Sequence, residues 1–339
     1  MRGICPIFAV AAAIGFAQQI DGPYKVLKTA KVGGEGGFDY VNADSDGRRL
    51  YVARSGSTKR IAVFNLDTLE AAGEIPGIGA HGAAVDPKSH HGFASSKPIV
   101  MFDTKTLKTI KTIEVQGNPD GLLFDPFNQR VYVLSHAAPN ATVIDTKDGS
   151  VVGTIDLGGA PEQGVTDGKG RLYIDIEDKN NVAVVDAKTM QVTAHYDLGD
   201  NKTPAGLAFD AKNHVLFVEC RNPAVSVIMN AQDGKIITTL PIGAGVDGAE
   251  FNPKTMEAFS SQGDGTLTVI KENGPTSFEV EQNVKTMPSA KTMTIDRKTN
   301  HVLLIGAEFG PATPPATPGG RPGRGPMTPG SFTILEVGK

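Results

Sequence analysis

A unit of about 42 residues recurs along the chain and constrains its fold more than any other feature. Each unit contains an acidic or amide marker residue before a turn, and a large apolar residue follows six or seven positions later. Successive markers are 42, 39, 42, 43, 42 and 44 residues apart. The markers are Asp44, Asp86, Asp125, Asp167, Asp210, Asn252 and Asp296. A period of this kind is typical of a repeat protein whose units stack on one another.

Short strand-like runs separated by turn-forming residues make up each unit. The runs 61–65 and 142–145, for example, are β-branched segments that end in Asn or Asp. Asp-Pro, Asn-Pro and Asp-Gly pairs mark the turns between such runs. Four strands in roughly 40–45 residues is the period of a β-propeller blade, whereas helical repeats would need apolar residues three and four positions apart. We therefore predict an all-β fold, a seven-bladed β-propeller with four-stranded antiparallel blades.

The two ends of the chain predict how the ring closes. Residues 24–32 resemble the fourth strand of a unit but precede the first marker, and the seventh unit ends at its third strand, 331–337. We therefore expect the N-terminal strand to complete the last blade, which would leave no open sheet edge at the junction. Residues 18–339 then form a single β-propeller domain.

The first 17 residues are predicted to be a secretory signal peptide. Arg2 precedes an apolar, Ala-rich run over 4–16, and Gly15 and Ala17 suit cleavage before Gln18. The run is shorter than the ~20 residues that a membrane-spanning helix needs, so an N-terminal anchor is the less favoured alternative. No later segment is apolar enough to span a membrane. We expect a periplasmic or secreted protein.

Charge and cysteine content narrow the classes of function. Removal of Arg2 with the signal peptide leaves 32 basic and 37 acidic residues, a net charge of −5. This balance argues against a nucleic-acid-binding protein, although a local basic patch stays open. Cys220 is the one cysteine after residue 17, so no intrachain disulfide can form, and we expect its thiol to be buried. We also expect the protein to be a monomer.

The strands after the markers resemble a known repeat. The segments 50–56, 130–133 and 171–174 are similar to the YVTN-type repeat of the YncE-like β-propellers, and the resemblance covers about residues 24–339. It implies an exported bacterial propeller of the broader WD40-like superfamily, in a family where many members have no assigned reaction. The segments 92–94 and 258–260 depart from the pattern because Val does not follow the aromatic residue. The chain has no Trp, which argues against a WD40 protein and against quinoprotein dehydrogenase propellers.

Polar residues that vary between units are the candidate site residues. One set stands five residues before each marker (four in the fourth unit), where the innermost strand begins at one mouth of the axial channel. It consists of Asp39, His81, Asp120, Gln163, Ala205, Asp247 and Lys291. A second set lies at the ends of the second strands, which rise to the same face. It consists of Arg54, His136, Glu177, Glu219, Arg221, Gln262 and Glu308. Polar groups that converge in a cleft indicate a binding site, although such groups also simply hydrate propeller channels.

Two classes of function remain open. No nucleophile elbow, P-loop, zinc-protease or dinucleotide motif occurs, which favours a non-catalytic binding or scaffold protein that recognises a small molecule or protein partner through the funnel face. The alternative is a lactonase-like hydrolase or lyase assisted by Ca²⁺ or Mg²⁺. Its metal ligands would be Asp39, Asp120, Asp247 and His81, with Lys291 as a competing partner for a carboxylate.

A Pro- and Gly-rich segment interrupts the last unit. Residues 311–330 contain seven prolines and five glycines where other units have a few residues. The composition predicts a partly polyproline-like loop that rises from the funnel face. It is a lid, a partner-docking arm or a tolerated surface insertion.

Overall fold

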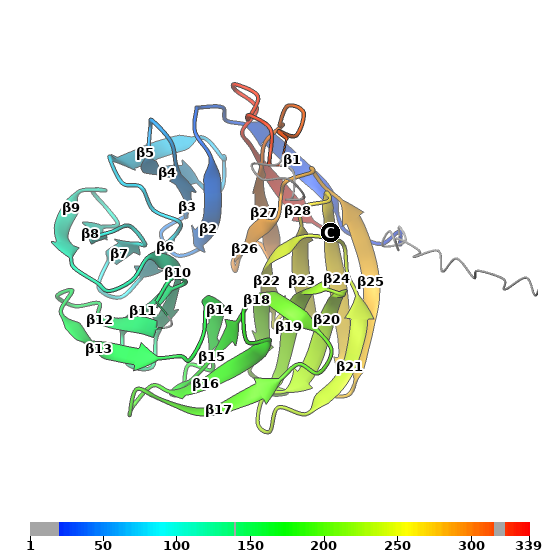
Figure 1. Cartoon of the computed structure of the whole chain (residues 1–339). Coiled ribbons are helices and arrows are strands. Elements are labelled where there is room, and N and C mark those ends of the chain that lie inside the picture. Colours follow the sequence, from blue (N-terminus) through cyan, green and yellow to red (C-terminus); the bar gives the residue numbers. More distant parts are fainter. Residues whose placement is uncertain (1–19, 139, 315–322) are drawn as a thin grey trace, which may run out of the picture.

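The computed structural model describes residues 20–138, 140–314 and 323–339. The predicted signal peptide, residues 1–17, and its cleavage site before Gln18 lie outside this part. The described residues form seven four-stranded sheets, each antiparallel, arranged as blades around a central axis (Figure 1). The predicted all-β, seven-bladed β-propeller is therefore confirmed. Within these same ranges, no helix reaches the length and apolar character that crossing a membrane requires.

In each blade the chain begins next to the axis and then runs outward (Figure 1). The inner strands are β2 (Phe38–Asp44), β6 (Ala83–Asp86), β10 (Pro119–Asp125), β14 (Pro161–Thr166), β18 (Lys202–Asp210), β22 (Val246–Asn252) and β26 (Thr292–Asp296). The second strands are β3 (Arg49–Arg54), β7 (His91–Ala94), β11 (Arg130–Ser135), β15 (Arg171–Ile176), β19 (Val215–Asn222), β23 (Glu257–Gln262) and β27 (His301–Gly306).

Two further strands complete each blade. The third strands are β4 (Arg60–Asn65), β8 (Ile99–Asp103), β12 (Asn140–Asp145), β16 (Asn181–Asp186), β20 (Ala224–Asn230), β24 (Thr266–Gly274) and β28 (Thr333–Gly338). The outer strands are β5 (Ala71–Pro76), β9 (Thr109–Ile113), β13 (Val151–Asp156), β17 (Gln191–Asp197), β21 (Ile236–Pro241), β25 (Ser277–Lys285) and β1 (Lys25–Lys31). Blades 1 to 7 are numbered here in the order of their inner strands.

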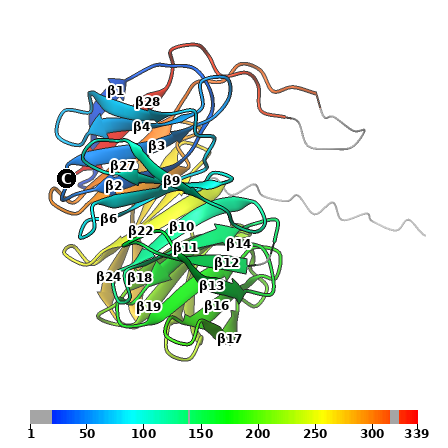
Figure 2. The ribbon, with the colours of Figure 1, turned by 90° about the vertical axis from the view of Figure 1, so that its left-hand side faces the viewer.

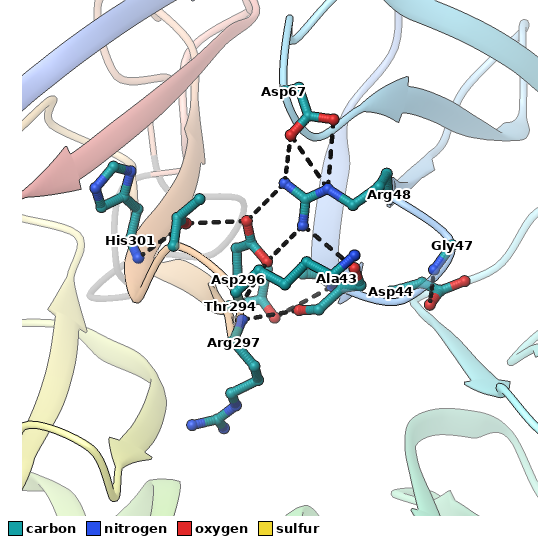
Figure 3. Close-up of polar contacts among 12 residues, drawn as sticks. Ala43, Asp44, Gly47, Arg48, Asp67, Thr294, Asp296, Arg297 and His301 are labelled. Carbon is teal, nitrogen blue, oxygen red and sulfur yellow. Dashed lines mark hydrogen bonds and ion pairs between the residues drawn. The ribbon is translucent and has the colours of Figure 1, made fainter.

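The ring is closed by the N-terminal strand, as predicted. In blade 7 the strand order is β26-β27-β28-β1, and β1 pairs antiparallel with β28 from Lys25 opposite Gly338 to Lys31 opposite Thr333. The same junction carries an ion pair between blades. The guanidinium of Arg48 lies against the carboxylate of Asp296, with two bonds of 2.8 Å (Figure 3). Both contacts join segments from opposite ends of the chain.

The marker residues recur because each one accepts a hydrogen bond in the turn that follows its inner strand. Asp44 Oδ1 accepts a hydrogen bond of 2.8 Å from the backbone N–H of Gly47, and a backbone N–H two or three residues on is bound at every other marker as well. Asp and Asn favour such turns because their short side chains satisfy the backbone locally. The repeat of the marker is therefore the repeat of the turn that joins the inner strand to the second strand.

The core lies between and within the blades. Large apolar residues six or seven positions after the markers sit on the second strands and are almost fully buried. They are Tyr51, Phe93, Tyr132, Tyr173, Phe217, Phe259 and Leu303. Tyr173 packs against Phe209 of the next blade, with ring centroids 5.3 Å apart. Burial of each large apolar side chain contributes roughly 1.5–3 kcal/mol, so the repeat supplies one buried anchor per blade.

The insertion in blade 7 leaves the body of the ring between β27 and β28 (Figure 2). Its described residues form a narrow arm in which Phe309 bridges Met327 and Thr313 bridges Gly323. Arg324 lies over the ring of Phe309, 4.5 Å from its centroid. In the view down the axis the described part of the arm stands at the rim and does not cover the channel (Figure 1).

Candidate functional site

Extra residues at the start of the inner strands position the candidate site. In β2, Phe38 opposes Arg54 but the next pair is Val41 with Val52, so the inner strand has one residue too many. The same one-residue bulge occurs at the start of β10, β14, β18 and β22. A bulge bends the strand and redirects a side chain. It falls at Asp39, Asp120, Glu162, Ala205 and Asp247.

Eight of the predicted site residues meet in one open cavity of about 400 Å³ at this mouth of the channel, which we call the charged cup. The cup is lined by Asp39, Tyr40, His81, Asn118, Asp120, His136, Glu162, Glu177, Arg221, Asp247 and Lys291. Five of the seven members of the first predicted set and three of the seven members of the second set therefore converge on the cup. Of these lining residues, five carry carboxylates and two carry permanent positive charges.

The acidic side of the cup centres on Asp120. His81 Nδ1 lies 2.7 Å from Asp39 Oδ2 and 3.3 Å from Asp120 Oδ1. His136 Nδ1 lies 3.2 Å from Glu162 Oε2, and its Nε2 lies 3.5 Å from a carboxylate oxygen of Glu177. Each of the two imidazoles thus lies within 3.5 Å of two carboxylates.

The basic side of the cup is already paired. Arg221 donates to Asp247 and, at 2.8 Å, to Glu177. Lys291 donates to the second oxygen of Asp247. Because Asp247 is only 5% exposed and binds both cations, its charge is compensated within the protein. The carboxylates of Asp39 and Asp120 have no such fixed cation against them among the described residues.

Burial and crowding of acids shift the pKa values in the cup. Burial, followed by the negative charges of Asp175 and Asp120, raises the pKa of Glu162 to about 9. Burial also raises the pKa of Asp120. The hydrogen bond to Asp39 raises the pKa of His81 and outweighs the opposing effect of burial. The acidic side therefore tends to keep protons, which is what an excess of negative charge in a partly dry cavity produces.

Two predicted residues lie elsewhere for reasons of local packing. The guanidinium of Arg54 is buried, donates to the carbonyls of the glycine-rich segment 33–37 and stacks on Phe332 at 3.8 Å from the ring centroid. Gln163 points further along the channel, where its Oε1 accepts a 2.8 Å bond from the N–H of Leu207. Neither side chain lines the cup.

The remaining members of the second set also lie outside the cup. Glu219 is fully buried on β19, accepts a 3.0 Å bond from Ser226 and has its pKa raised to about 8 by burial. Gln262 is buried and bonds Ser260 within its blade. Glu308 is exposed at the root of the arm, 3.8 Å from Lys31. The rule that the second strands end at the cup therefore holds for His136, Glu177 and Arg221 but fails for these three and for Arg54.

Three lining residues were not predicted. Glu162, not Gln163, occupies the ring position in blade 4, because the missing residue of this unit lies in the turn after Asp167 rather than in the inner strand. Counting five residues back from Asp167 finds Glu162, so the signal was present. Tyr40 and Asn118 have no periodic signal, and their place depends on the bulge and on the preceding loop.

Two overlapping sets of side chains have the spacing of cation ligands. One ligand atom each from Asp39, His81 and Asp120 lies within 4.8 Å of the others, and the same holds for Asp120, His136 and Glu162. Imidazole and carboxylate donors together suit Zn²⁺ or Mn²⁺, whereas Ca²⁺ and Mg²⁺ prefer oxygen ligands alone. Asp247, which the sequence suggested as a ligand, belongs to neither set.

Neither a family model nor a curated protein sequence matches the chain. Among solved structures, one similar chain belongs to the crystal structure of a mitotic checkpoint complex, with a TM-score of 0.71, 11% identity, and coverage of 90% of this chain and 95% of that chain. Another comes from Kuenenia stuttgartiensis hydrazine synthase, with a TM-score of 0.68, 15% identity, and coverage of 79% and 92%. At these identities the likeness establishes the shared fold alone.

Proposed function

We propose that this chain is an exported binding protein of the YncE-like kind that takes a cationic ligand in the charged cup. The carrying observation is the convergence of five carboxylates on one cavity whose two fixed cations are already bound to Asp247 and Glu177. The apolar run after Arg2 supports export, and the strands after the markers support the family resemblance. The neighbour from a checkpoint complex belongs to an assembly, which is in keeping with a propeller used as a binding platform.

Charge selects the ligand class. Asp39 and Asp120 share one imidazole between them, so a cation placed there would gain carboxylate contacts without displacing Arg221 or Lys291. An anion such as a nucleic-acid phosphate would meet an excess of negative charge at the same place. The cup therefore favours a metal cation or an organic amine over a polyanion.

A second candidate function is a hydrolase or lyase assisted by a divalent cation, with a lactone-like substrate. It is favoured by the ligand atoms of Asp39, His81 and Asp120, which lie within 4.8 Å of one another. A divalent cation bound there would supply Lewis-acid polarisation of a carbonyl oxygen. His81 would act as a ligand in its neutral form and would release its proton on binding.

Calorimetric titration of the purified protein with Mn²⁺, Zn²⁺, Ca²⁺ and spermidine tests both candidates. We expect one binding event per chain, at least tenfold weaker in Asp39→Asn/Asp120→Asn and unchanged in the control Asp148→Asn/Asp197→Asn, whose acids are exposed far from the cup. Saturable metal binding would be followed by a lactone screen, in which turnover would select the second candidate and its absence the first, and spermidine binding alone would select the first. If no probe binds, or if the cup variant binds as tightly as the control, the proposal is wrong.

A further inference from the structure

The junction between blades 5 and 6 contains two buried carboxyl groups that contact each other. Asp210, the marker of blade 5, is fully buried, and Glu272 on β24 of blade 6 is only 3% exposed. The two side chains share a hydrogen bond. Such a bond requires that one carboxyl group keeps its proton, because an ionised carboxylate can only accept.

Glu272 occupies a position that recurs at the end of the third strands. Its backbone N–H donates to the carbonyl of Met256 at 3.0 Å, just as the N–H of Thr146 in blade 3 donates to the carbonyl of Gln129. In blades 1, 2, 4 and 5 the corresponding donors are the N–H groups of Leu66, Thr104, Ala187 and Ala231. Glu272 is therefore the one acid among these six equivalent positions.

Thr146 shows what this position does at another junction. Its hydroxyl donates to the carboxylate of Asp86, the marker of blade 2, at 2.7 Å, and both residues are 1% exposed. The marker of one blade is thus bonded to the third strand of the next blade. Glu272 stands in the same relation to Asp210, but here a carboxyl group replaces the hydroxyl. The bond between these two blades therefore exists only while a proton is present.

The surrounding hydrogen bonds place this proton on Glu272. The two carboxylate oxygens of Asp210 accept from the backbone N–H groups of Lys212 at 2.9 Å and Asn213 at 3.0 Å, which favours the ionised form of Asp210. Glu272 Oε1 accepts from the side-chain amide of Asn213 at 2.6 Å. Glu272 Oε2 is buried and receives no hydrogen bond from the described residues. Oε2 is therefore the oxygen that carries the proton and donates to Asp210.

The electrostatics of the pair agree with this assignment. Burial is the main cause that raises the pKa of Glu272 to about 7, and both the charge of Asp210 and the hydrogen bond to it act in the same direction. The amide of Asn213 and the exposed ammonium of Lys212 lower this pKa and are outweighed.

The strands beside Glu272 offer no closer compensation. Lys271, the preceding residue of β24, donates to the carbonyl of Thr255 at 2.6 Å and lies 3.7 Å from the carboxylate of Glu257. On β25 the residue opposite Glu272 is Phe278. The cation next to Glu272 in the chain is therefore engaged by another acid, and the residue across the sheet is apolar.

We propose that Glu272 and Asp210 form a proton-dependent latch between blades 5 and 6, which holds while Glu272 is protonated and weakens when both carboxyl groups are ionised. The same junction carries the contact between Arg221 of blade 5 and Asp247 of blade 6 in the charged cup. The latch thus lies at one end of the junction and the cup at the other, and the latch needs no ligand in the cup.

Urea unfolding of the wild type and of Glu272→Gln at about pH 5.5 and about pH 8.5 tests the latch, because Gln keeps an N–H donor and cannot ionise. The folded pKa of Glu272 is raised, so the proton's contribution to stability is lost as the pH rises through about 7. We expect the unfolding constant of the wild type, relative to that of Glu272→Gln, to rise at least about tenfold over this range.

The matched control is Glu279→Gln, which makes the same change at an exposed position of β25. It should show the pH dependence of the wild type. If Glu272→Gln does not fold, Glu272→Thr replaces it, because it restores the residue type that blade 3 uses at this place.

Hydrogen exchange measures the junction itself. At about pH 8.5, peptides that cover β18 and β24 should exchange faster in the wild type than in Glu272→Gln, whereas peptides of β8 and β12 should exchange equally. Parallel pH profiles for the wild type and Glu272→Gln would overturn the proposal, as would an equal effect of Glu279→Gln. No measurement here involves a cation in the cup, so the result is separate from that of the proposed function.

Discussion

Replacing Arg48 by Ala should loosen the junction between the first and last blades. The guanidinium lies between two carboxylates that differ in burial: Asp296 is 2% exposed and Asp67 is 61% exposed (Figure 3). The bond to Asp296 joins residues 248 positions apart, so it acts on ring closure, while the bond to Asp67 stays within blade 1. Arg48 thus makes one ion pair across the blade junction, which is the contact to be tested, and one within blade 1, which serves as the control contact.

The expected loss follows from the titration of Asp296. Burial would raise the pKa of this carboxyl, but Arg48, the N–H of Lys298 and the hydroxyl of Thr299 outweigh it and lower the pKa from 3.8 to about 2. A shift of that size corresponds to roughly 2 kcal/mol of native-state stabilisation from all partners together. Since Lys298 and Thr299 remain, and since Arg48 is itself partly solvated, we expect Arg48→Ala to cost about 1–2 kcal/mol.

Urea unfolding at neutral pH measures this cost, and a double-mutant cycle with Asp296→Asn isolates the pair. Asp67→Ala should cost no more than about 0.5 kcal/mol, since an exposed pair contributes little. The folded pKa of Asp296 is depressed, so its contribution is complete above pH 3.8 and is lost as the pH falls through about 2. A coupling below about 0.3 kcal/mol, or an equal cost for Asp67→Ala, would refute the reasoning.

One further substitution and one thiol reagent test the roles of two buried side chains, Arg54 and Cys220. Arg54→Met should lower stability by about 2 kcal/mol, because the buried guanidinium binds the carbonyls of residues 33–37, and a urea midpoint equal to that of the wild type would contradict this role. Cys220 is fully buried and burial raises the pKa of its thiol, so in the chain 18–339, which lacks Cys5, Ellman's reagent should not react with the native protein but should titrate one thiol per chain in guanidinium chloride.

The repeat period predicted most of the architecture because each unit carries its own local reasons to fold. A marker such as Asp44 bonds the backbone of its own turn, and a large residue such as Tyr51 is buried between strands of its own and the next blade. Closure by residues 25–31 was also predictable, since a fourth strand was missing from the last unit and an unpaired strand preceded the first. In the fourth unit the five-residue spacing of the other units leads to Glu162, and Gln163 follows only if the missing residue is placed in the inner strand rather than in the turn after Asp167.

The sequence by itself determined the number of blades, the strand content and the axial position of Asp39, His81, Asp120, Asp247 and Lys291, because these follow from periodic short-range patterns. Only the tertiary structure decided which side chains share a cavity. The bulges turn Asp39 and Asp120 toward His81, whereas packing draws Arg54 onto Phe332 and Glu219 into the blade interior. These outcomes depend on contacts between residues far apart in the chain, and no local pattern records them.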